Sequence, residues 1–288
     1  MVKKDYAYVL VHFGSNPKYL ELELYFIKML QLNTNYDIVY MYSCHDTPQE
    51  FIKIVKLLKV RMFSYDDRNI TYDIKNFTSS YISFNTLRTC NFLFASKLTE
   101  YKKICMVESD LVLTQNIDSI FNLQEPAILH YYYKNYVKQN ENNQITLDKN
   151  NLLSCCSEKS NFNGGVLLFS PSEKLYHTFI KNISLIIKNN CKYPNELLFA
   201  LSFSKIYNLP IRYNFSHYFL GKDYNIKTIY IYHFNESQYK PLSIIKNNYL
   251  TKEKDCKRKI ILLYFKKTTY DKYHKYIDKL MKKYLKNI

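Results

Sequence analysis

The sequence predicts an α/β fold with a mainly parallel sheet flanked by helices. The β-rich run Tyr6–Phe13 is followed by turn residues at 14–17, by helical spacing of apolar residues from Tyr19, and by a second short strand at Ile38–Tyr42. Such a β-α-β opening implies parallel strands joined by a right-handed crossover. A buried-strand pattern at Ile104–Val107 supports the same class, and 288 residues with 47% hydrophobic content suffice for one large domain.

The later segments continue this alternation of helices and strands. Pro48 is expected to start a helix that buries Phe51, Ile54, Val55 and Leu58, and Asp118 is interpreted as the N-cap of a short helix rather than a catalytic acid. We expect helices over 84–98, 173–188 and 195–206, strands over 104–107, 166–169 and 229–232, an extended segment at 212–214, and irregular polar segments over 64–82 and 131–160.

Composition narrows the classes of function. The net charge of +16 would attract polyanions, but Lys, Asn, Ile and Tyr are abundant throughout and no RNP, zinc or helix-turn-helix signature occurs, so we expect no nucleic-acid partner. Seven cysteines without a C-x-x-C pair indicate free thiols. No apolar run approaches 18 residues and no signal-peptide pattern opens the chain, so we expect a cytoplasmic protein without a transmembrane span.

The chain has neither internal repeats nor a clear linker. We expect one domain over residues 1–250 and a Lys-rich helical extension over 251–288. The extension places Tyr273, Ile277, Leu280 and Tyr284 on one helix face, which favours packing on the domain over lying on an anionic membrane.

Two carboxylates mark the candidate site. Glu108, Ser109 and Asp110 directly follow the apolar run 104–107, so the acids are expected at the C-terminal edge of the sheet, where ligands bind in open α/β folds. Carboxylates one residue apart can converge on a hard cation that prefers oxygen ligands. The pattern alone is weak, because most such triplets are solvated turns.

Several motifs, in order along the chain, resemble those of glycosyltransferase family 8, the glycogenin-like enzymes with a GT-A nucleotide-sugar fold. They are the acidic segment 101–113 with the D-x-D-like motif, residues 115–121, the FNGGVLLFSPS segment 162–172, Asn195-Glu196, the LPIRYN segment 209–214, His233-Phe234 and Lys240-Pro241. The resemblance covers roughly residues 5–245. It implies a GT-A-type, Rossmann-like mixed and mainly parallel sheet, and a retaining hexosyltransferase that uses a UDP-sugar.

The resemblance also implies roles for individual residues. Glu108, Asp110 and His233 would bind a divalent metal, manganese before magnesium. Asp110, Asn195 and Glu196 would be catalytic, and the residues expected to bind the donor are Tyr19, Arg88, Ser109, Asn163, Gly164, Gly165 and Lys240. The acceptor, a glycan, a protein or the enzyme itself, is not specified. The family often dimerises, so a homodimer is included among the expected partners.

Other interpretations of the same residues remain open at this stage. His233 could be a hydrogen-bonded, half-buried histidine, Lys240 a solvated surface lysine, and Tyr19 a core aromatic. Residues 163–165 could form a plain turn before a strand. Glu196 could be a partner of a helix dipole.

The chain departs from the family pattern at several positions. Glu108 replaces an aspartate, Asn195 and Glu196 replace an Asp-Gln pair, and Leu242 stands in place of a tryptophan. These departures support one alternative function, a nucleotide-sugar-binding module that has kept the fold and lost the chemistry.

Overall fold

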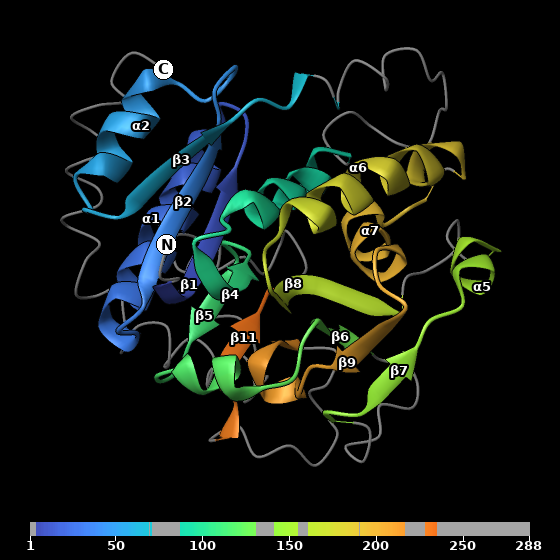
Figure 1. Ribbon diagram of the computed structural model, residues 1–288. Helices are drawn as coiled ribbons and strands as arrows, with labels where there is room; N and C mark the ends of the chain where they lie inside the picture. The colour runs from blue at the N-terminus through green and yellow to red at the C-terminus, as the bar shows by residue number, and fades with distance from the viewer. Residues whose placement is uncertain are drawn as a thin grey trace, which may run out of the picture.

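An eight-stranded mixed sheet runs through the centre of the protein in the order β3-β2-β1-β4-β8-β6-β9-β7 (Figure 1). This computed structural model describes residues 4–68, 70, 87–130, 141–154, 161–189, 191–216 and 228–234. The strands of this sheet are β1 (Lys4–His12), β2 (Asp37–Ser43), β3 (Arg61–Tyr65), β4 (Tyr101–Val107), β6 (Ala127–His130), β7 (Gln144–Thr146), β8 (Phe162–Phe169) and β9 (Lys205–Asn208). The first four strands in that order are parallel, and β8 pairs antiparallel with both β4 and β6.

A smaller sheet of three strands lies beside the large one. It consists of β5 (Leu111–Leu113), β10 (Phe215–Ser216) and β11 (Ile231–His233), in the order β10-β11-β5. β11 is antiparallel to β5, and His233 stands opposite Leu111. Because β5 begins one residue after Asp110, this pairing brings the end of β11 to the acidic segment.

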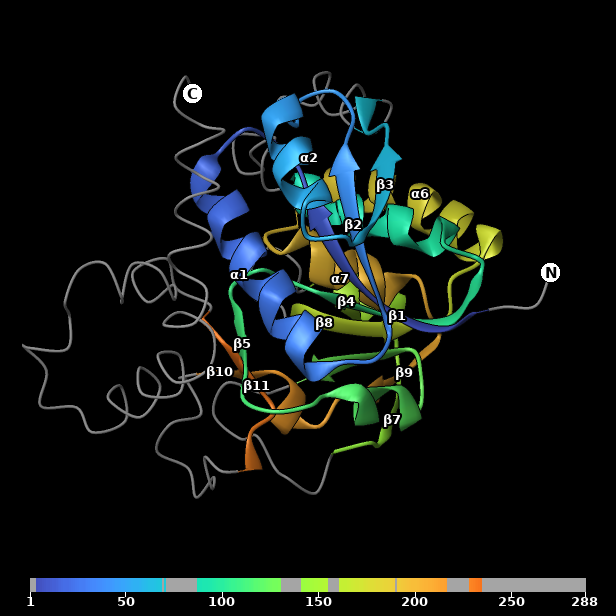
Figure 2. The same ribbon diagram turned by 90° about the vertical axis from the view of Figure 1, so that its left-hand side faces the viewer.

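Helices lie on both faces of the large sheet. The helices in the described residues are α1 (Pro17–Asn33), α2 (Gln49–Lys56), η1 (Thr89–Lys97), η2 (Asp118–Asn122), α5 (Lys149–Ser154), α6 (Glu173–Lys188), α7 (Pro194–Leu201) and η4 (Ile211–Tyr213). Figure 2 shows α1 and α2 on one side of the sheet and α6 on the other. The fold class expected from the sequence, a mainly parallel mixed sheet flanked by helices, is confirmed.

Successive side chains of β1 point to opposite faces of the sheet, so they belong to two separate layers of the core. Tyr8 and Leu10 belong to a cluster with α1, α2 and the small sheet, whereas Ala7 and Val9 belong to a cluster with η1, α6 and α7. All four side chains are at most 1% exposed. A strand buried on both faces needs a nearly continuous apolar sequence, which explains the run at the start of the chain.

Several expected elements are confirmed with small shifts at their ends. α6 spans the predicted 173–188, and the Ser172 side chain caps it by accepting a hydrogen bond from the Leu175 amide at 3.1 Å. α2 buries Phe51, Ile54 and Val55 as the spacing predicts. The acidic segment follows β4, as expected.

Other elements differ from the sequence prediction, because their secondary structure depends on pairing with strands that are distant in the sequence. β3 lies at the edge of the large sheet and occupies 61–65, a stretch that includes the start of the region expected to be irregular. β7 and α5 occupy parts of 131–160, which was expected to lack regular structure. The helix expected over 195–206 ends at Leu201, because residues 205–208 form β9 between β6 and β7.

Within the described residues, the helix expected over 84–98 is present as the 3-10 helix η1, in which bonds run to the third preceding residue, as from the Leu98 amide to the Ala95 carbonyl at 3.1 Å. Two further local predictions are wrong. Residues 211–213 form the 3-10 helix η4 instead of an extended segment. Asp118 is not an N-cap, because its carboxylate accepts hydrogen bonds from Thr34 Oγ1 at 2.5 Å and Tyr8 Oη at 3.1 Å. It therefore connects the end of α1 to η2.

Some expectations lie outside the described residues. These are the extension over 251–288, and with it the domain division, and the position of Lys240. No helix within the described part of the chain is both long and apolar enough to cross a bilayer. Cys44, Cys90, Cys105 and Cys191 are free thiols, and of these four Cys44 alone is exposed.

Candidate metal and donor site

Backbone hydrogen bonds hold the acidic segment between the two sheets. The Glu108 amide donates to the Gly165 carbonyl at 3.0 Å, which extends the pairing of β4 with β8 by one residue. The Asp110 carbonyl accepts from the Phe234 amide at 3.0 Å, directly after β11. Each acid is thus fixed to a different strand, and the imidazole of His233 lies beside both.

The side chains of Glu108, Asp110 and His233 converge. His233 Nε2 lies 3.3 Å from Glu108 Oε2 and 3.4 Å from Asp110 Oδ1, and the three ligand atoms lie within 4.8 Å of one another. Asp110 is 6% exposed and His233 4%. Neighbouring ligands in an octahedral shell with bonds of about 2.1 Å stand about 3 Å apart, so two carboxylates and one imidazole at these separations fit a divalent cation.

Asn214 orients the histidine. Its Oδ1 accepts from His233 Nδ1 at 2.9 Å, while its Nδ2 donates to Asn163 Oδ1 at 2.9 Å. The amide orientation is therefore set by Asn163, and Nε2 of His233 faces the two carboxylates. A second hydrogen bond of this kind fixes the tautomer in metal-binding histidines. Sequence reasoning gave Asn214 no role, although it ends the LPIRYN motif.

The metal-free site favours a proton on His233. Burial alone lowers the pKa of this imidazole, but the nearby carboxylates of Asp110 and Glu108 outweigh burial and raise the pKa to about 9. The same negative potential that holds the proton would attract a cation.

Gly164 and Gly165 lie inside β8, so the interpretation of residues 163–165 as a plain turn is wrong. A Cβ atom on Gly165 would lie 2.3 Å from Cε1 of His233, and one on Gly164 would lie 2.8 Å from Nδ2 of Asn195. The Gly165 amide donates to Asn163 Oδ1 at 3.0 Å. Both glycines thus provide room for functional side chains from other elements, Gly165 for the histidine and Gly164 for the start of α7.

Asn195 and Glu196 lie in the first turn of α7, next to β8. Glu196 Oε1 accepts from the Gly164 amide at 3.2 Å. Both side chains are partly exposed. The structure therefore brings two of the three residues expected to be catalytic to the strand that also carries Asn163.

A cavity of about 670 Å³ opens at the C-terminal ends of β1 and β4. Its volume lies in the range of small-molecule and cofactor sites. It is lined by Leu10, Val11, Phe13, Gly14, Ser15, Asn16, Tyr19, Glu23, Asp46, Arg88, Thr89, Phe92, Met106, Val107, Glu108, Ser109 and Asp110. The predicted site residues Tyr19, Arg88 and Ser109 thus share one cavity with both acids.

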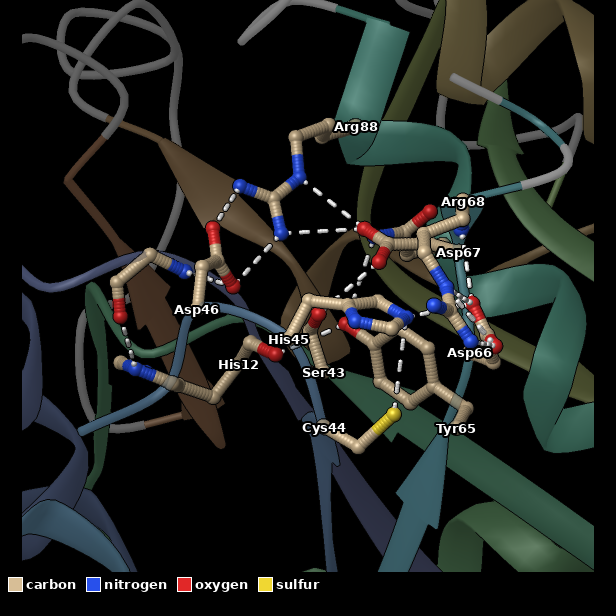
Figure 3. Close-up of polar contacts among 12 residues, drawn as sticks. His12, Ser43, Cys44, His45, Asp46, Tyr65, Asp66, Asp67, Arg68 and Arg88 are labelled. Atoms are coloured by element: carbon tan, nitrogen blue, oxygen red, sulfur yellow. Dashed lines mark hydrogen bonds and ion pairs between the residues drawn. The ribbon is translucent and has the colours of Figure 1, made fainter. Parts of the chain in front are cut away.

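Arg88 reaches this cavity in a fixed orientation. Its guanidinium donates to Asp46 Oδ1 from Nη2 at 2.9 Å and to Asp67 Oδ2 from Nε at 3.1 Å (Figure 3). Two carboxylates face its single positive charge, and the side chain is 5% exposed. Sequence reasoning missed Asp46 as a lining residue and Asp67 as a partner, because neither lies near Arg88 in the chain.

No protein-family model matches the chain. It is similar to the uncharacterized protein R707 of Acanthamoeba polyphaga mimivirus, with 27% identity over 249 residues and 82% of each chain covered.

Similar solved structures include three glycosyltransferases. They include the galactosyltransferase LgtC with donor and acceptor sugar analogs (TM-score 0.56, 11% identity, 91% of this chain and 96% of that one) and GlyE of Streptococcus pneumoniae TIGR4 (0.54, 17%, 96% and 64%). The bifunctional enzyme WbbM also matches (0.54, 14%, 82% and 46%). The chain thus spans less than two thirds of the GlyE and WbbM chains. The chain has the GT-A glycosyltransferase fold.

Proposed function

We propose that this chain is a metal-dependent, retaining glycosyltransferase of the family 8 type. It would transfer a hexose or N-acetylhexosamine from a UDP-sugar to a glycan or protein acceptor. The observation that supports this most directly is the convergence of Glu108, Asp110 and His233 at the edge of a donor-sized cavity in a GT-A fold.

The cavity suits a nucleotide that binds at the C-terminal ends of β1 and β4. Tyr19 lines this cavity and is 47% exposed, and a uracil would stack on its ring. Ser109 would contact the diphosphate from between the two acids. Lys240 would pair with the β-phosphate as a compact charge.

The chemistry requires stabilisation of the charge that develops on the departing diphosphate. A divalent cation supplies Lewis-acid stabilisation of that charge when it is bound. Glu108, Asp110 and His233 would hold it, and two oxygens with one nitrogen suit manganese better than magnesium. Asn214 keeps Nε2 of the histidine available for this role.

The donor sugar would lie toward β8 and α7. Asn163, Gly164 and Gly165 leave space and polar groups near the sugar hydroxyls, and Glu196 would orient the donor sugar or the acceptor hydroxyl. The hydrogen bond from the Gly164 amide fixes the Glu196 carboxylate at this position. Asn195 stands beside it at the start of α7.

Release of UDP from a panel of UDP-sugars by the purified protein tests the proposal. We expect one sugar to be cleaved with manganese, and to a smaller extent with magnesium, and no release with a chelator. Asp110→Asn should lower the release by at least ~100-fold, because it removes a metal ligand while it keeps the shape of the side chain. Asp148→Asn, which changes an exposed carboxylate beside α5, should retain activity.

Metal-independent UDP release, or full activity of Asp110→Asn, would overturn the proposal. Absence of release from every sugar would be followed by thermal unfolding with UDP and manganese. Stabilisation that Asp110→Asn removes would then identify the alternative, a nucleotide-sugar-binding module without transferase activity.

A further inference from the structure

A second group of metal-ligating side chains lies outside the site described above. Cys44 follows β2 and Asp66 follows β3, two parallel strands in which Ser43 is paired with Tyr65. The Cys44 amide donates to the Tyr65 carbonyl at 2.9 Å, so the residues after the two strands lie side by side. His45 adds its ring to this pair (Figure 3).

The three donor atoms are already close together. His45 Nε2 lies 3.6 Å from Cys44 Sγ and 2.5 Å from Asp66 Oδ1, and all three atoms lie within 4.8 Å of one another. In a tetrahedral zinc site with bonds of about 2.3 Å to sulfur and 2.0 Å to nitrogen, these two ligands stand about 3.5 Å apart. The shorter distance to Asp66 is that of an imidazole N–H donating to a carboxylate, and a cation would replace this hydrogen.

The chemistry of this group differs from that of the first site. Sulfur, nitrogen and oxygen together suit a borderline cation such as Zn²⁺, whereas Mg²⁺ and Ca²⁺ prefer oxygen alone. All three side chains are exposed, which leaves room for water as a fourth ligand. Arg68 donates to Asp66 Oδ2 from Nη2 at 2.7 Å and holds the carboxylate in place. Those hydrogen bonds keep the pKa of Asp66 well below its usual range, so this ligand is ionised at neutral pH.

The two turns that carry these ligands also hold Arg88. Asp46 follows His45, Asp67 follows Asp66, and both carboxylates bind the Arg88 guanidinium at the edge of the cavity. We propose that Cys44, His45 and Asp66 form a second metal site, for a zinc-like divalent cation, which fastens together the two turns that position Arg88. The site itself does not depend on the function proposed above; only the consequence for the donor cavity does.

Cobalt titration of the 288-residue chain in the Asp110→Asn background tests this proposal, because that background disables the first site. We expect one equivalent of Co²⁺ to bind with the near-ultraviolet charge-transfer band of a cobalt–thiolate bond. Zn²⁺ should displace the cobalt and abolish the band. Cys44→Ser should remove the band, and His45→Gln should weaken cobalt binding at least tenfold although it keeps all seven cysteines.

Matched controls distinguish cobalt binding at this site from binding to other thiols, and loss of binding from loss of the fold. Cys90→Ala changes a cysteine buried in the core and should leave the band intact. Far-ultraviolet circular dichroism should show the same fold in each variant. A band that persists in Cys44→Ser, binding that His45→Gln leaves unchanged, or the absence of stoichiometric binding would overturn the proposal and leave an ion-paired surface cluster only.

Discussion

Two buried histidines of this protein face carboxylates, and their surroundings differ. His12 Nδ1 lies 2.9 Å from both carboxylate oxygens of Glu23, and its Nε2 lies 3.0 Å from the Gly14 carbonyl. Tyr40 also donates to Glu23, at 2.6 Å. At His233, by contrast, Nε2 lies between carboxylates of two different residues at 3.3 and 3.4 Å.

The contrast separates a structural ion pair from a ligand site. Both nitrogens of His12 face groups that accept hydrogen bonds, so the protein itself satisfies an imidazolium ion there. At His233, two acids from the segment between β4 and β5 converge with a histidine from β11, and their spacing suits a shared cation more than a shared proton. A glycine accompanies each histidine for a different reason. Gly14 has a φ of +86°, which other residues rarely adopt, whereas Gly165 gives the His233 ring its space.

Gly165→Ala should have the largest effect and should act on the His233 site alone. The new Cβ would lie 2.3 Å from the His233 ring, so the ring or β8 must move. Manganese affinity measured by calorimetry should fall by about 100-fold or more, because displacement of a ligand by about 1 Å disrupts the shared geometry. UDP release should fall at least as much.

Gly164→Ala is the matched control. Its Cβ would meet Nδ2 of Asn195 at 2.8 Å, the end of a side chain that can rotate. Manganese affinity should stay near that of the unmodified protein. Unchanged manganese affinity in Gly165→Ala would contradict the assignment of His233 as a ligand.

Local patterns explain how much of the fold could be predicted from the sequence. The opening β-α-β unit, β4 and α6 carry apolar periodicity or capping residues of their own, and they were predicted close to their observed ends. β3 and β9 lack such signals. They are strands because a neighbouring backbone offers hydrogen bonds, and that neighbour is distant in the sequence.

The candidate site was predictable to a similar extent. Two acids after a buried strand pointed to the sheet edge, but only the family resemblance joined His233 to them, across more than 100 residues. The antiparallel pairing of β11 with β5, which no local pattern encodes, brings them together. Glycine usually indicates a turn, so a plain turn stayed open as an alternative at 163–165, whereas both glycines lie inside β8 and serve close packing.

Glu23→Gln should have the next largest effect and should act through His12 on stability. Burial lowers the pKa of His12, but the charge and hydrogen bonds of Glu23 outweigh it, so the folded-state pKa is raised above the unfolded value of about 6.5. A raised pKa adds stability that is fully present below pH ~6.5 and is lost as the pH rises through the folded-state value. The variant should lose about 2 kcal/mol below pH ~6.5, and this difference should shrink at higher pH.

Urea unfolding of both proteins at several pH values, with a chelator present, measures this difference. His233 titrates in both proteins, so its contribution cancels in the difference between their free energies of unfolding. Glu173→Gln removes an exposed carboxylate from the first turn of α6 and should cost less than about 1 kcal/mol, without this pH dependence. A loss in Glu23→Gln that is constant with pH would show that His12 is not charged in the folded protein.

The pH dependence expected at His233 has the opposite sign. Because the metal-free pKa is about 9, a cation must displace a proton from Nε2 at neutral pH. Manganese affinity should therefore rise by about tenfold for each pH unit between about 6 and 8, while the contribution of His12 to stability declines as the pH passes its own pKa. Calorimetry in two buffers of different ionisation enthalpy should detect about one proton released per ion. His233→Gln should bind manganese weakly with no such release, and a pH-independent affinity in the unmodified protein would place the histidine outside the metal shell.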